Sequence, residues 1–144
     1  MSAVTKMEEK LTRREVREGA FIILYQTMFG QTPQEITEAD EESLGLARNH
    51  ETDAMVRGVM AHDEELTSII AKYSTTRSVA RISKVNLVIL KIAVYEIKYD
   101  DRVPGAAAIN EAVELGKKYA YKQDCGFING VLNSYLEELE NARD

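Results

Sequence analysis

The chain has 144 residues, of which 44% are hydrophobic and 29% charged, and its formal net charge is −6. That length is enough for one domain with a core of its own, and two prolines leave few breaks in helical segments. A single cysteine excludes an internal disulfide and, with only two histidines, argues against a zinc site. Without a signal peptide or a run of ~20 apolar residues, we expect no membrane span and a cytoplasmic location.

The negative charge is unevenly distributed along the chain. Residues 31–70 carry two basic and ten acidic residues, whereas residues 71–102 carry seven basic and three acidic ones. No carboxylate lies between Leu66 and Tyr95. Such blocks are ordinarily solvated faces. The alternative is a confined basic surface that suits a polyanion, with the acidic block turned away from it.

The first predicted helix starts at a capping box, in which Thr12 and Glu15 satisfy each other's backbone N–H groups. Apolar residues at helical spacing carry it to about Phe29, before Gly30. Residues 32–35 repeat the capping signature with Pro33 at the first helical position. They predict a short acidic helix to about residue 43, followed by a polar loop over residues 45–52.

The second half of the chain is predicted to be helical as well. An amphipathic helix is expected over residues 53–73, then a short one near 79–82. Ser83 caps a mostly apolar segment, 84–99, whose β-branched residues allow a strand but whose length favours a central buried helix. Helices over 105–121 and 126–141 follow. The fold class is therefore all-α, with about seven helices in one domain over residues 1–144 and a flexible N-terminus at 1–10.

Catalytic motifs are absent from the sequence. It contains neither of the glycine-rich loops that bind nucleotide phosphates. Cys125 precedes a predicted helix, but His50 and His62 are far from it in sequence. We therefore expect neither histidine to act as the base that would activate the thiol. We expect no enzyme, no cofactor and no metal site.

Three arginines in the first turns of the first helix indicate binding instead. Arg13, Arg14 and Arg17 lie where the helix dipole disfavours cations. Backbone N–H groups and guanidinium groups together suit a phosphate. The alternative is an ordinary charged helix end whose arginines pair with nearby glutamates.

Other polar and aromatic residues interrupt apolar segments. Lys91 lies within the central apolar helix, so it either extends to the surface or reaches a ligand. Phe127, at the start of the last helix, is either a core residue or a plate for an unstacked RNA base. Tyr25 has the same two interpretations, and Asn86 and Asn129 are further polar positions in apolar helices.

Four sequence blocks, in order, resemble the NusB transcription antitermination family. They are Arg13-Arg-Glu-Val-Arg-Glu-Gly-Ala20 with Leu24-Tyr-Gln26, Val85-Asn-Leu-Val-Ile-Leu-Lys-Ile-Ala-Val-Tyr-Glu96, Val103-Pro104 with Ala108-Ile-Asn-Glu-Ala-Val-Glu-Leu115, and Phe127-Ile-Asn-Gly-Val-Leu132. The resemblance implies a fold of two packed three-helix bundles. It also implies a protein that binds boxA RNA of ribosomal RNA leader transcripts together with NusE, the ribosomal small-subunit protein. That complex joins RNA polymerase with NusA and NusG and suppresses termination, without catalysis.

The resemblance also implies which residues contact RNA. They are Arg13, Arg14, Arg17, Tyr25, Asn86, Lys91, Phe127 and Asn129. Lys91 stands where the family has arginine, and Asn86 where an acidic residue is common. The segment from Lys122 to Phe127 departs from a common family form, because Gly126 replaces the lysine before the phenylalanine.

Two other functions fit a helical chain of this kind. One is a protein–protein interaction module that does not bind RNA. The other is the RNA-binding domain of a larger ribosomal RNA methyltransferase, although no methyltransferase sequence follows here. The resemblance allows either a monomer or a homodimer.

Overall fold

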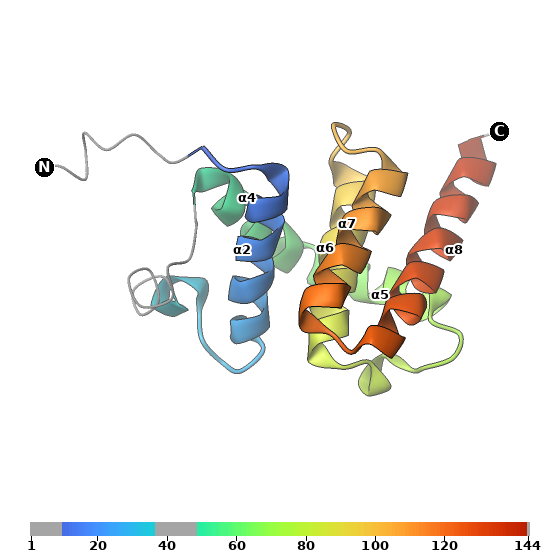
Figure 1. Cartoon of the computed structure of the whole chain (residues 1–144), viewed down its shortest axis with the longest axis horizontal. Helices are drawn as coiled ribbons and strands as arrows, with labels where there is room; N and C mark the ends of the chain where they lie inside the picture. Colours follow the sequence, from blue (N-terminus) through green and yellow to red (C-terminus); the bar gives the residue numbers. More distant parts are fainter. Residues whose placement is uncertain (1–9, 37–48, 144) are drawn as a thin grey trace, which may run out of the picture. The chain divides into compact units, whose positions relative to one another are not determined.

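A computed structural model of the protein describes residues 10–36 and 49–143. Helices are the only regular secondary structure in these ranges, which confirms the all-α prediction (Figure 1). The chain divides into two compact units, Met1–Arg57 and Gly58–Asp144. In the described part of the chain, no helix is both long enough and apolar enough to cross a membrane. The predicted flexible N-terminus lies, except for Lys10, outside the described residues.

The first unit is built on α2 (Arg13–Thr27). The predicted capping box is present, because Glu15 N donates to Thr12 Oγ1 at 3.1 Å and Thr12 N donates to Glu15 Oε1 at 2.8 Å. The helix ends two residues before the predicted end. A turn then leads to Gly30, whose φ of 95° is a left-handed conformation that glycine adopts without steric cost.

The second capping box is also present. Glu35 N donates to Thr32 Oγ1 at 3.1 Å, Thr32 N donates to Glu35 Oε1 at 2.8 Å, and residues 33–36 are helical. The backbone hydrogen bond from Thr32, and then the one from its side chain, lowers the pKa of Glu35. The rest of the predicted acidic helix lies outside the described residues, as do residues 45–48 of the predicted loop.

The predicted helix 53–73 is wrong in two respects. The structure has two helices there, α4 (His50–Ala61) and α5 (Asp63–Tyr73). The first begins earlier because Asn49 Oδ1 accepts the backbone N–H groups of Glu51 at 2.9 Å and Thr52 at 3.1 Å, which makes Asn49 its cap. The helix is interrupted at His62. Three acidic residues then occupy the first turn of α5, the position that the helix dipole favours for them. The apolar spacing continues across this break and conceals it.

The second unit packs its helices around α6 (Lys84–Tyr99), which contacts α5, α7 (Gly105–Tyr119) and α8 (Cys125–Arg143). Figure 1 shows α6, α7 and α8 side by side. Nine of the 16 residues of α6 are buried, which confirms the predicted central helix. Two short 3-10 helices, η1 (Val79–Arg81) and η2 (Lys122–Asp124), lie before α6 and α8 respectively. Asn86 N donates to Ser83 Oγ at 3.1 Å, as the predicted cap requires.

Candidate nucleic-acid interface

The first turns of α2 present the three predicted arginines differently. Arg14 is exposed, and the side chain of Arg13 is 34% exposed with its Nη1 atom 3.9 Å from Glu51 Oε2. Arg17 is only 6% exposed. Arg13 and Arg17 lie one turn apart on the same side of the helix, and Arg14 lies about 100° around it. Of the three arginines, Arg13 and Arg14 therefore reach the surface of this turn.

Tyr25 lies in a row of aromatic rings along α2. Its ring centroid is 6.1 Å from that of Phe21, in a stacked arrangement, and 5.1 Å from that of Phe29, in an edge-on one. Phe29 is 60% exposed, whereas Tyr25 is half-buried. Twelve residues of helix place Tyr25 about 18 Å along the axis from Arg13. The structure therefore separates Tyr25 from the arginine turn.

The two predicted residues of α6 occupy different environments. Lys91 Nζ lies 2.7 Å from Asp63 Oδ1 at the start of α5, and its side chain is 12% exposed. Asn86 is fully buried, and neither polar atom of its side chain has a hydrogen-bond partner in the structure. Five positions along a helix place them about 140° apart. Contact of these two residues with RNA stays a prediction.

The start of α8 brings Phe127 together with residues from elsewhere in the second unit. The guanidinium carbon of Arg77 lies 4.2 Å from the centroid of the half-buried Phe127 ring. Arg77 Nη2 donates to Asp124 Oδ1 at 3.1 Å. Asn129 is exposed, and its carbonyl accepts from the Asn133 side chain at 3.0 Å. Phe127 and Asn129 point about 200° apart around α8, so a single flat surface does not use both.

Sequence reasoning missed the pairing of Arg77 with Asp124 and Phe127. Arg77 and Asp124 are 47 positions apart, in a loop and a 3-10 helix respectively. No periodicity or capping pattern relates two such positions. The only signal in the sequence is Arg77's place among the cations of the stretch without carboxylates.

Part of the stretch predicted as a confined basic surface is paired with carboxylates. Three of its five cations pair with carboxylates from other parts of the second unit: Lys72 Nζ with Glu138 Oε1 at 3.0 Å, Arg77 with Asp124, and Lys91 with Asp63. Farther along α6, Lys98 Nζ lies 2.5 Å from Glu65 Oε2. We call Lys72, Arg77, Lys91 and Lys98 the paired cations. Folding therefore neutralises much of the charge that the sequence concentrates there.

Hydrogen bonds shift the pKa values of the groups around Glu65. The hydrogen bond from Lys98, followed by that from the Tyr99 hydroxyl, lowers the pKa of Glu65. The same Lys98–Glu65 bond raises the pKa of Lys98. The bond to Glu65 also raises the pKa of Tyr99. This cluster is thus charged at neutral pH and balanced within itself.

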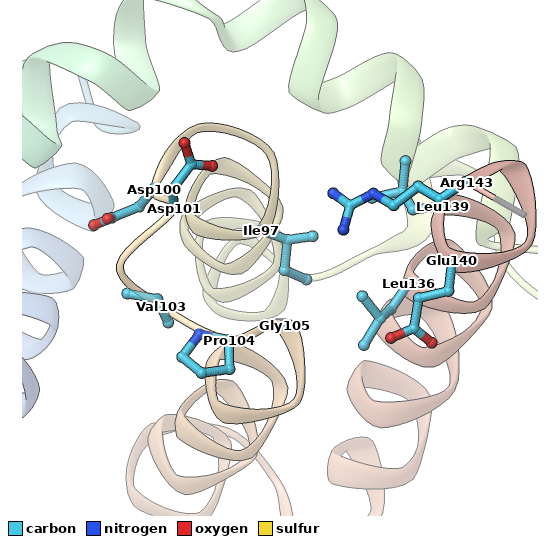
Figure 2. Close-up of a pocket in the computed structure, with 10 residues that line it drawn as sticks. All are labelled: Ile97, Asp100, Asp101, Val103, Pro104, Gly105, Leu136, Leu139, Glu140 and Arg143. Atoms are coloured by element: carbon cyan, nitrogen blue, oxygen red, sulfur yellow. The ribbon is translucent and has the colours of Figure 1, made fainter.

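A pocket of about 210 Å³ lies at the other end of the second unit (Figure 2). Apolar side chains from the end of α6, the start of α7 and the end of α8 line it, with Asp100, Asp101, Glu140 and Arg143 at its edge. None of the predicted RNA-contacting residues lines it. Within residues 10–36 and 49–143, no three His, Cys, Asp or Glu side chains gather as metal ligands would.

Comparison with known proteins gives a consistent result. Residues 14–137 match the model of the NusB family. A transcription antitermination protein NusB from Agathobacter rectalis is 35% identical over 130 residues, which is 87% of this chain and 99% of that protein. One from Clostridium botulinum is 36% identical over 143 residues, covering 92% of this chain and all of that protein.

The same likeness extends to a solved structure. A crystal structure of the antitermination factors NusB and NusE in complex with double-stranded RNA contains a chain that is 27% identical to this one. The match has a TM-score of 0.75 and covers 88% of this chain and 96% of that chain.

Proposed function

This chain belongs to the NusB family, and we propose that it is a transcription antitermination factor that binds boxA-type RNA of ribosomal RNA operons. The observation that carries the proposal is the family match over residues 14–137, which includes parts of both units. Similar proteins named as antitermination factors align over almost their whole length. A solved relative is crystallised with NusE and RNA.

The geometry supports two RNA-contacting regions. The first is the N-terminal turn of α2, where the exposed Arg14 and the partly exposed Arg13 stand beside the positive end of a helix dipole. The second is the start of α8, where the half-buried Phe127 ring suits stacking with an unpaired base. Contact through Arg17, Tyr25, Asn86, Lys91 and Asn129 is proposed from the family resemblance.

The proposed role is binding rather than catalysis. In it, NusE joins the chain on boxA RNA, and the complex assembles with RNA polymerase, NusA and NusG in the cytoplasm to suppress termination. Both units act together as one RNA-binding domain. A homodimer that covers the arginine turn would compete with RNA, so light scattering with and without RNA belongs with the binding measurement.

Fluorescence anisotropy of a labelled boxA RNA tests this function. The chain is titrated alone and with NusE, and a scrambled RNA of the same length and composition is the control. We expect boxA to bind more tightly than the scrambled RNA and NusE to strengthen that preference. Equal or absent binding of both RNAs in both mixtures would contradict the proposal and favour a protein–protein interaction module.

A further inference from the structure

Arg77 is held at three points in the second unit. Its guanidinium lies over the Phe127 ring at 4.2 Å, and its Nη2 atom donates to Asp124 Oδ1 at 3.1 Å. Its backbone carbonyl accepts a hydrogen bond from Ser74 Oγ at 2.5 Å, at the end of α5. The loop between α5 and α6 is thereby tied to the start of α8.

Two of these contacts, with Phe127 and Asp124, restrict the guanidinium. Asp124 is mostly buried, with a side chain 13% exposed, and that of Arg77 is 34% exposed. A charged hydrogen bond with little access to solvent is screened less than a surface pair. Asp124 lies directly before α8, where the helix dipole favours a carboxylate. Asp124 is therefore in a favourable position to hold the Arg77 guanidinium.

The Arg77 guanidinium limits both the rotation of the Phe127 ring and the face on which a base can stack. A cation over one aromatic face is attracted by the ring quadrupole. It occupies that face and disfavours rotation of the ring away from it. A base that stacks on Phe127 would use the opposite face, in an orientation that Arg77 has already set. Ordering the ring before binding reduces the entropy that binding costs.

We propose that Arg77, anchored by Asp124, is a positioning residue that holds the Phe127 ring ready to stack with an RNA base. This inference rests on the proposed function. It goes beyond the family resemblance, which assigns no role to Arg77 or Asp124. Phe127 makes the contact with RNA, and Arg77 acts through it.

The competing role for Arg77 is direct contact with an RNA phosphate. To make it, the guanidinium would leave Asp124, so the carboxylate would be a competitor. The variant Asp124→Asn separates the two roles by the sign of its effect. Loss of the anchor weakens RNA binding if Arg77 positions the ring, whereas loss of a competitor strengthens it if Arg77 binds phosphate. Asparagine caps helices as well as aspartate does, so the start of α8 is preserved.

The experiment measures boxA RNA affinity in the presence of NusE, over a range of salt concentrations, for the full chain and its variants. We expect Arg77→Gln and Asp124→Asn each to weaken binding about five-fold, the scale of a cation–π contact. We expect Arg77→Lys to fail to restore binding, because lysine lacks the planar guanidinium and its fixed set of N–H donors. The slope of log affinity against log salt stays that of the wild type, since no phosphate contact is lost.

A double-mutant cycle links the effect to the ring. In a Phe127→Ala background, Arg77→Gln should cause no further loss, because the group it positions is gone. Arg102→Gln is the charge-matched control. Arg102 lies in the turn before α7, whereas Phe127 follows the C-terminal end of that helix. Thermal unfolding of each variant identifies any loss of binding caused by misfolding, and Arg77→Lys and Asp124→Asn remain informative if Arg77→Gln is unstable.

Three results would overturn the inference while leaving the proposed function intact. They are tighter binding by Asp124→Asn, wild-type affinity for Arg77→Gln, and a salt slope that falls by about 0.7 in Arg77→Gln. Failure of the wild-type chain to prefer boxA RNA would instead overturn the proposed function, and this inference with it. The wild-type titration therefore tells the two failures apart.

Discussion

The N-terminal turn of α2 and the paired cations of the second unit differ in the surroundings of their positively charged side chains. In α2, Arg14 is exposed, and Arg13 Nη1 lies 3.9 Å from Glu51 Oε2, at the limit of an ion pair. In the second unit, Lys91 lies 2.7 Å from Asp63 and Lys98 lies 2.5 Å from Glu65. Arg13 and Arg14 thus reach the surface at a helix N-terminus, whereas Lys91 and Lys98 form short ion pairs within the second unit.

This difference shows that a count of charges along the sequence does not locate a polyanion surface. The stretch from Leu66 to Tyr95 has no carboxylate, yet its partners come from α5, η2 and α8. Residues 1–30, which include the α2 turn, carry five basic and four acidic residues. There, Glu15 closes the capping box with Thr12.

Removal of the α2 cations should have the largest effect. We expect Arg13→Ala combined with Arg14→Ala to lower boxA RNA affinity about 100-fold at low salt, because two charge-assisted contacts are lost. The salt slope should fall by about 1.4, the value for two phosphates of a single strand. Anisotropy titrations at several salt concentrations measure both quantities.

The matched control removes two of the paired cations. Lys72→Ala combined with Lys98→Ala takes away the same charge from groups that pair with Glu138 and Glu65. Its salt slope should equal that of the wild type. If the two double variants change the slope equally, the contrast between the regions is wrong.

Phe127→Ala should have the next largest effect. Loss of one stacked base is expected to reduce boxA affinity about 10-fold without changing the salt slope. Tyr121→Ala is the control, because it removes an aromatic ring that is 75% exposed and close in sequence. Equal losses for both variants would show that any aromatic side chain near the start of α8 suffices.

Thr12→Ala tests the cap that supports the arginine turn. Loss of the Thr12–Glu15 box should reduce the free energy of unfolding by about 1 kcal/mol. Urea unfolding followed by circular dichroism measures it, and Thr12→Ser should restore most of the loss. Unchanged stability in Thr12→Ala would mean that the α2 turn is held by packing alone.

The smallest expected effect concerns pH and the paired cations. Because the pKa of Glu65 is lowered in the folded state, its pair stabilises the protein above the ordinary value of 4.5, and that contribution is lost as the pH falls through the lowered pKa. We therefore expect Glu65→Gln to be less stable than the wild type at pH 7. At pH 3 the difference should shrink, and a difference that grows there would contradict the assigned coupling.

The parts of the fold that depend on neighbouring residues were predicted from the sequence. The capping boxes at Thr12 and Thr32, the cap at Ser83 and the buried α6 all follow from local spacing. The break at His62 was missed because the apolar period runs through it.

Contacts between distant residues could not be predicted in this way. Lys91 with Asp63 and Arg77 with Asp124 depend on how helices pack, which one sequence does not contain. The candidate site divides along the same line. The position of Arg13 and Arg14 at a helix start was predictable, whereas the surroundings of Phe127 and the burial of Asn86 were not.

Amide NMR chemical shifts of the full chain, recorded with and without boxA RNA and NusE, test the central contrast most directly. Spectra with NusE alone serve as the reference, so that partner contacts are subtracted. We expect RNA-dependent shifts at Arg13, Arg14 and the first turn of α8, with none at Lys72 or Lys98. Shifts confined to Lys72, Lys98 and their carboxylate partners would contradict it.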